Sequence, residues 1–241
     1  MRALATTARV LGQIRHDPRT IGLLLVVPSL LIGLMAWLFA DTEIFQQIGP
    51  AVLGLFPFII MFLVTSITTL RERRSGTLER LLTMPISKLS FILGYALAFG
   101  LLAIVQAVIA VTFAVWVCGL EIEGSVWLLL AVALADGLLG TTLGLFASAF
   151  ARTEFQVIQF MPALVFPQVI LGGVIIARDQ MPDALYAISD WLPLSHAIDA
   201  LNAVSRDSED AAYVGGKLLV IGAFALGAIV LGALTLRRRS V

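Results

Sequence analysis

The residue best suited to chemistry in this sequence is Asp136, a carboxylate in the middle of a long apolar stretch, residues 127–150. A carboxylate inside a membrane is costly and often carries protons or ions, so Asp136 could serve an ion-coupled carrier. Such a carrier predicts that Asp136→Asn abolishes transport and that no ATPase is needed. A protonated or hydrogen-bonded aspartate at a helix interface, near Thr141 and Thr142, would also explain the residue. Both roles stay open.

Other side chains offer little for catalysis or for a metal site. His16 and His196 are predicted below to lie on opposite sides of a membrane, so they cannot form one site. No paired carboxylates and no Ser/His/Asp set converge within the apolar stretches. Cys118 is the single cysteine, which excludes an intrachain disulfide and a cysteine-based metal cluster. We therefore expect no enzyme activity and no bound metal.

The sequence also lacks a phosphate-binding loop. That loop has the pattern Gly-x-x-x-x-Gly-Lys-Ser/Thr. Lys88 and Lys217 are the only lysines, and the run Gly215-Gly216-Lys217 is followed by leucine. The chain is therefore not expected to bind a cofactor itself. If ATP and Mg are used, a separate partner chain must bind them.

The composition places the chain in a membrane. Hydrophobic residues make up 59% of it and charged residues 13%, and its mean hydropathy is +0.98. A spanning helix needs about 20 mostly apolar residues. We expect an all-α, polytopic membrane protein with six spans, near residues 21–40, 50–70, 91–118, 127–150, 157–176 and 214–236. Prolines that interrupt these spans predict kinks at Pro28, Pro57, Pro162 and Pro167.

Charge is segregated between alternate connections, which orients the spans. Basic residues gather in the first 20 residues, in residues 71–88 and in the tail after 236, whereas acidic residues gather in 41–43, 121–123 and 179–210. Basic segments stay cytoplasmic, so both termini are predicted inside, as an even number of spans requires. We expect one membrane domain, residues 1–241, in a cell membrane of prokaryotic type.

Two segments outside the spans show helical spacing of apolar residues. In residues 1–20 this pattern favours an interfacial helix on the inner membrane surface, with a flexible arm as the alternative. In residues 177–213 it occurs twice, separated by Pro193, and predicts two short outer helices. Ser195 is predicted to cap the second of these helices. A lid or exit gate and a loop that merely packs on the bundle are equally open for this segment.

The charged segment 71–87 lies between the second and third spans. Gly76 interrupts the preceding helix, Glu79 lies in the first turn of a new helix, and Pro85 ends it. About eight residues at 1.5 Å each would span roughly 12 Å, enough to occupy a groove on a partner. A solvated loop would explain the arginines, but not the order of the glycine, the leucines and the proline.

The chain resembles the permease subunits of ABC type-2 exporters over nearly its whole length. The first matching piece runs from Arg71-Glu72 through Gly76-Thr77-Leu78-Glu79, Leu81-Leu82 and Pro85. The second comprises Ala151-Arg152-Thr153-Glu154-Phe155-Gln156, Gln159, Pro162, Pro167, Gly172, Met181-Pro182 and Leu192-Pro193-Leu194. One departure is Ile176-Ala177, where many relatives have a proline in second place.

The resemblance implies a coupling helix that docks into a separate ATP-binding subunit, and outer re-entrant helices between spans five and six. Members of the family carry drugs, lipids or polysaccharides. We expect the partner subunit to contact Glu72, Arg73, Gly76, Thr77, Leu78, Glu79 and Leu82. Two ATP-binding subunits need two coupling helices, so a second permease chain, identical or different, is also expected.

The fifth span combines amides with aromatic and thioether side chains, which suits a hydrophobic or amphipathic substrate. The candidate pathway residues are Gln156, Gln159, Phe160, Met161, Phe166 and Gln168, together with Asp136. Ordinary packing between helices explains them equally well. Gly140 and Gly144 could allow close helix approach, within the bundle or between chains. The expected partners are therefore protein subunits and the lipid bilayer, with no nucleic acid.

Overall fold

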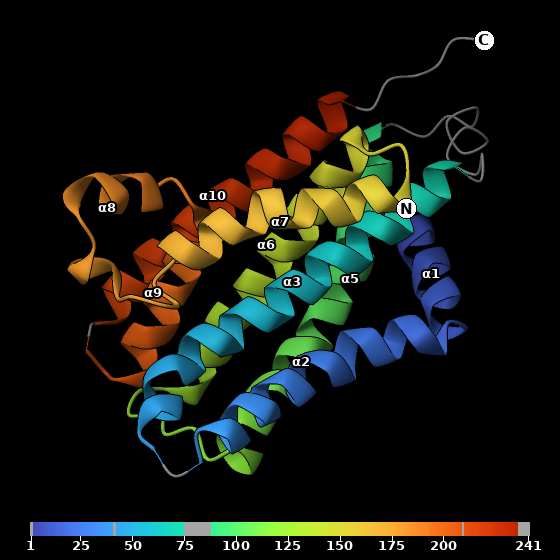
Figure 1. Ribbon diagram of the computed structural model, residues 1–241. Coiled ribbons are helices and arrows are strands. Elements are labelled where there is room, and N and C mark those ends of the chain that lie inside the picture. Colours follow the sequence, from blue (N-terminus) through green and yellow to red (C-terminus); the bar gives the residue numbers. More distant parts are fainter. Residues whose placement is uncertain (1, 41, 75–87, 209, 236–241) are drawn as a thin grey trace.

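The computed structural model describes residues 2–40, 42–74, 88–208 and 210–235, and these are helical apart from short connections (Figure 1). The elements are α1 (Arg2–Arg15), α2 (Pro18–Leu38), α3 (Ile44–Arg74), α5 (Lys88–Thr112), the π-helical turn η1 (Phe113–Val117), α6 (Val126–Phe150), α7 (Glu154–Leu171), the 3₁₀ turn η2 (Arg178–Gln180), α8 (Asp183–Ser189), α9 (Pro193–Ser205) and α10 (Ala211–Thr235). The predicted all-α fold is confirmed.

Six of the described helices are long and apolar enough to cross a membrane, which confirms the predicted number of spans. They are α2, α3, the run from Leu93 to Val117 that joins α5 to η1, α6, α7 and α10. The helix predicted in the first 20 residues is present as α1, and its place at a membrane surface stays a prediction. Most of the predicted coupling segment, residues 75–87, lies outside the described residues.

Helix α6 lies at the centre of the bundle, packed against α3, α5, α9 and α10 (Figure 1). Its closest neighbour is α3, because two glycines let the backbones approach. A Cβ added at Gly140 would lie 2.6 Å from the carbonyl oxygen of Phe58, and one at Gly144 would lie 2.5 Å from that of Phe62. The glycine pair therefore joins two helices of one chain.

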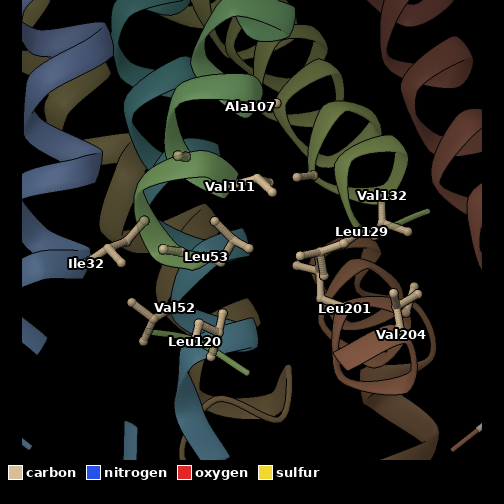
Figure 2. Packing of buried hydrophobic residues seen from close by; sticks show 14 of the residues in the cluster. Ile32, Val52, Leu53, Ala107, Val111, Leu120, Leu129, Val132, Leu201 and Val204 are labelled. Atoms are coloured by element: carbon tan, nitrogen blue, oxygen red, sulfur yellow. The ribbon is translucent and has the colours of Figure 1, made fainter. Parts of the chain in front are cut away.

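The largest hydrophobic cluster fills the space between α2, α3, α5, α6 and α9. Figure 2 shows Leu53 and Val111 facing Leu129 and Leu201 across this space. All four are 0–2% exposed. Because helices from both halves of the sequence contribute side chains, the bundle has one continuous core at this level.

Helix α9 does not cross the bundle but is inserted into one end of it. Nearly all its residues are buried, among α3, α6, α7 and α10. Its first turn is capped from α7, where the Gln168 side chain accepts a hydrogen bond from the Leu194 N–H at 3.1 Å. The prediction that Ser195 caps this helix is wrong, because Pro193 already occupies the first helical position, where its fixed φ suits the helix.

The bundle has two distinct ends. At one, here called the arginine end, the last turn of α3 meets α1, the C-terminal end of α6 and the start of α7. At the other, the α9 end, the connection before α6 is bonded to the end of α9: Gly124 N–H donates to Val204 O at 3.1 Å and Glu123 N–H to Ser205 O at 3.0 Å. Arg9, Arg71 and Arg73, which belong to two of the basic segments predicted to be cytoplasmic, lie at the arginine end.

Candidate functional site

The last turn of α3 is held to α1 by a partly buried ion pair, and Arg9 of that pair also bonds to α5. The Arg9 guanidinium of α1 donates to the Glu72 carboxylate of α3 and, over 3.1 Å, to the hydroxyl of Tyr95 on α5. The Glu72 side chain is 9% exposed and that of Arg9 29%. Thr7, also on α1, donates to the Gly94 carbonyl at 3.0 Å. Helix α1 is therefore fixed to the bundle by specific polar contacts.

Two more arginines of this turn reach α6 and α7. Arg73 donates to the Ser148 carbonyl near the C-terminus of α6, where a positive charge is favourable. Arg71 forms two hydrogen bonds to the Glu154 carboxylate at the start of α7, of 2.8 and 3.0 Å. The end of α3 is thus connected to four other helices at the point where the chain enters residues 75–87. We call this set of contacts the α3 junction.

Two of the seven residues predicted to contact an ATP-binding partner, Glu72 and Arg73, are described, and both face other helices of this chain. The other five, Gly76, Thr77, Leu78, Glu79 and Leu82, lie outside the described residues. Sequence reasoning did not find Arg9 or Tyr95. Arg9 is 63 positions from Glu72 and 86 from Tyr95. A periodic pattern indicates which residues of one helix share a face, but not which distant residues come into contact.

Asp136 is completely buried in the middle of α6. Neither carboxyl oxygen has a hydrogen-bond partner among the described residues. The hydroxyl groups of the nearby threonines donate to backbone carbonyls and not to Asp136: Thr141 donates to Gly137 O and Thr142 to Leu139 O, both at 3.0 Å. The described residues therefore do not support the explanation of Asp136 as an aspartate hydrogen-bonded at a helix interface.

The candidate pathway residues on α7 do not share one face. The Gln156 amide oxygen accepts from the Arg152 N–H at 2.7 Å, and Gln168 is buried as the cap of α9. Gln159 and Phe166 are exposed. Two residues, Phe160 and Met161, are half-buried against hydrophobic clusters. Of the six candidate pathway residues on α7, only Gln159 and Phe166 are therefore exposed.

At the α9 end, Arg178 of η2 joins three elements. Its guanidinium donates to Asp190 after α8, to Asp199 of α9 and, over 2.8 Å, to the Ser189 hydroxyl. Lys217 of α10 donates to the same Asp199 carboxylate at 2.7 Å. Burial alone would lower the pKa of Arg178, but Asp199 and Asp190 outweigh it, so its pKa is raised and the side chain stays charged.

No group of three or more metal-ligating side chains gathers within the described ranges. The described side chains instead form contacts between helices: the α3 junction at the arginine end, the Arg178 network at the α9 end, and the close pair of α3 and α6 between them.

A family model described as ABC-2 type transporter matches residues 3–205 of the chain. The chain belongs to the ABC-2 type transporter family. It is 25% identical over 164 residues to ABC transporter G family member 20 of Dictyostelium discoideum, an alignment covering 68% of this chain and 22% of that protein.

Two relatives from Escherichia coli strain K12 also match this ABC-2 chain. It is 27% identical over 150 residues to the probable multidrug ABC transporter permease YbhR, covering 62% of this chain and 41% of the relative. It is 30% identical over 149 residues to the inner membrane transport permease YhhJ, covering 61% and 39%. The chain therefore spans less than half the length of the curated relatives it matches.

The Arg178 network should hold η2, α8 and α9 of this ABC-2 domain together. We expect Arg178→Met to lower the free energy of unfolding by about 2–3 kcal/mol, less than for a fully buried pair because Asp190 is half exposed. The measurement is thermal unfolding of the purified chain in detergent. Asp190→Asn, which removes only the more exposed partner, should cost less than about 1 kcal/mol. Equal losses for the two variants would contradict the central role given to Arg178.

Proposed function

We propose that this chain is the membrane-spanning permease subunit of an ATP-driven ABC exporter. It moves a hydrophobic or amphipathic substrate, drug-like or lipid-like, out of the cell, and efflux of antibiotics is one activity of this kind. Two copies of a separate ATP-binding subunit bind ATP and Mg and supply the energy. The observation that supports the proposal is the α3 junction, which links the last turn of α3, next to the predicted coupling segment in the sequence, to four other helices.

In this mechanism the energy arrives as movement. ATP closes the two partner subunits, and their movement shifts the coupling segment. The α3 junction passes that shift to α1 and α5 through Arg9, to α6 through Arg73 and to α7 through Arg71. These helices then change position relative to one another, and the pathway alternates between inward and outward access. Burial of Glu72 favours rigid transmission, because separation from Arg9 would leave a buried carboxylate without its arginine.

The proposal is tested with an ATP-binding cassette subunit encoded beside this chain. The two should co-purify, and together in proteoliposomes they should export a lipophilic dye when ATP is supplied. Glu79→Lys combined with Leu82→Ala should abolish both binding and export. Intact binding and export in that double variant would show that the contact residues are wrongly assigned, and failure of any such partner to co-purify would contradict the ATP-driven mechanism.

We further propose that the uncovered face of α7 lines the substrate pathway between two permease chains. In each of α2, α7 and α10, only 17% of the most apolar part is buried. Of these three, α2 and α10 are strongly apolar, as a helix facing lipid should be, whereas α7 is the least apolar of the six candidate spans.

The uncovered face of α7 is poorly suited to lipid. It exposes Gln159, and the missing N–H groups of Pro162 and Pro167 leave the Ile158 and Ala163 carbonyls without their usual partners in the helix. Hydrocarbon cannot hydrogen-bond such groups, but water in a cavity or another protein chain can. A second copy of the permease facing this side of α7 would supply the protein chain and enclose the water-filled cavity.

Cysteine cross-linking tests this arrangement in a Cys118→Ser background. Gln159→Cys on α7 should give a disulfide-linked dimer in membranes on mild oxidation. The matched control is Leu219→Cys on α10, which is 77% exposed on a strongly apolar helix and should stay monomeric. Equal cross-linking at both positions would show random collision and would remove the support for α7 as the paired face.

An ion-coupled carrier that uses Asp136 is the second candidate, favoured by the absence of a hydrogen-bond partner for its carboxyl group among the described residues. It predicts that export continues without any ATP-binding subunit and stops in Asp136→Asn. Membership of the ABC-2 family favours the ATP-driven mechanism instead.

A further inference from the structure

The Asp136 carboxyl group is sealed between three helices. It is 0% exposed, and its oxygens have no hydrogen-bond donor in the part of the chain that the structure describes. Gly54 of α3 leaves the space that the carboxyl occupies: an added Cβ there would lie 3.6 Å from Asp136 Oδ2 and 2.7 Å from Leu201 Cδ1 of α9. The group thus lies at the point where α3, α6 and α9 meet.

No described charged side chain on the neighbouring helices pairs with Asp136. Helix α6 packs against α3, α5, α7, α9 and α10. Their titratable residues are Arg71, Glu72, Arg73 and Arg74 on α3, Lys88 and Tyr95 on α5, Glu154 on α7, His196 and Asp199 on α9, and Tyr213 and Lys217 on α10. None of the ion pairs between described side chains includes Asp136.

The α3, α5 and α7 groups are distant along the helix axes. Gly54 and Ala103 mark the level of Asp136 on α3 and α5, because an added Cβ at Gly137 would lie 3.4 Å from Ala103 Cβ. Glu72 and Lys88 are 18 and 15 residues from these markers, roughly 27 and 22 Å at 1.5 Å per residue, and Tyr95, which is uncharged, is 8 residues away, roughly 12 Å. Glu154 lies at the arginine end with the α3 group, against Arg71.

The α9 and α10 groups are nearer but are bound to one another or to the outer turn. Asp199 is two residues from Leu201, about 200° around the helix, and pairs with Lys217 and Arg178. His196 Nε2 lies 2.9 Å from the Asp190 carbonyl oxygen. An isolated buried carboxylate would cost several kcal/mol or more, so Asp136 holds a proton in this arrangement.

We propose that Asp136 is a proton-binding switch whose proton is held while α3, α6 and α9 are packed as in this structure and is released to water when they separate. Closing this contact forms one O–H bond at the carboxyl group, and opening it breaks that bond. A higher pH therefore favours the open arrangement and a lower pH the packed one. The link to transport rests on the proposed function, because only there does separation of these helices belong to the export cycle.

The protonation state can be measured on the isolated full-length chain in lipid nanodiscs by infrared spectroscopy. The spectrum of the natural chain minus that of Asp136→Asn, at neutral pH, should show the C=O stretch of a protonated carboxyl group. The bands of an ionised carboxylate in its place would overturn the proposal.

The link to helix separation needs a second readout. In a Cys118→Ser background, Leu201→Cys places a thiol at the closed contact, where a water-soluble maleimide reacts only after the helices part. Between about pH 6 and pH 8.5, the labelling rate should rise by up to about tenfold per pH unit more than in the same reporter carrying Asp136→Asn, the limit for one proton. The comparison removes the titration of the thiol itself.

Equal pH profiles in the two backgrounds would overturn the switch. If Asp136→Asn does not insert, Trp191→Cys, at a position 78% exposed, supplies the reference profile for an accessible thiol, and the steeper rise is then expected at Leu201→Cys alone. Neither readout uses an ATP-binding subunit. A negative result here therefore contradicts the Asp136 switch without contradicting ATP-driven export. Failure of an ATP-binding partner to bind would contradict ATP-driven export without contradicting the protonation of Asp136.

Discussion

Gly144→Ala should destabilise the chain by about 1–3 kcal/mol, because the added methyl group would press on the backbone of α3. Its Cβ would lie 2.5 Å from the Phe62 carbonyl oxygen, far inside normal contact distance. A flexible side chain could turn away, but a helix backbone can move only if α3 and α6 separate. Gly140→Ala, at 2.6 Å from the Phe58 carbonyl oxygen, should have a similar effect. The midpoint of thermal unfolding in detergent measures both.

The chain provides a graded set of controls for this prediction. Gly222 on α10 has nothing within 4 Å of an added Cβ, so Gly222→Ala should stabilise the chain by up to about 1 kcal/mol through helix propensity. Gly54→Ala should fall between, because it meets the end of the Leu201 side chain at 2.7 Å, which can adjust. If Gly144→Ala proved as stable as Gly222→Ala, the close approach of α3 and α6 would not be a determinant of the fold.

The number and nature of the spans could be predicted from the sequence because membrane insertion is decided by local hydropathy. The packing of those spans could not, since nearly every side chain in them is apolar and the pattern does not distinguish lipid from protein neighbours. Gly140 and Gly144 were recognised as a place of close approach, but their spacing did not show that α3 of the same chain occupies it.

The segment from 177 to 213 shows the same limit. Its two short helices were predicted from apolar spacing, whereas insertion of α9 into the bundle depends on contacts from distant residues. The cap on that helix comes from Gln168, which the sequence had placed among substrate contacts, and not from Ser195. Local capping rules select a neighbour in the sequence, so a cap supplied by another helix escapes them.

Removal of Arg9 from the α3 junction should have the second large effect. Arg9→Met should lower the free energy of unfolding by about 3 kcal/mol, because it leaves the buried Glu72 carboxylate without its arginine, and Arg9 is itself only 29% exposed. Exchanging the charges, with Arg9→Glu and Glu72→Arg together, should recover part of that loss. If the junction transmits movement as proposed, ATP-driven export should fall in the single variant even where the ATP-binding partner still binds, and should return in part with the exchanged pair.

A double-mutant cycle isolates the pair from the other contacts of each residue. The neighbouring Arg71–Glu154 pair is the matched control: it joins the same turn of α3 to α7, but its side chains are 60% and 41% exposed. Exposed pairs of this kind are worth about 0.2–1 kcal/mol, so its coupling energy should be well below that of Arg9 and Glu72. Equal coupling energies would mean that burial does not strengthen the link to α1. Export that falls with Arg71→Met but not with Arg9→Met would place the mechanical connection on α7 instead.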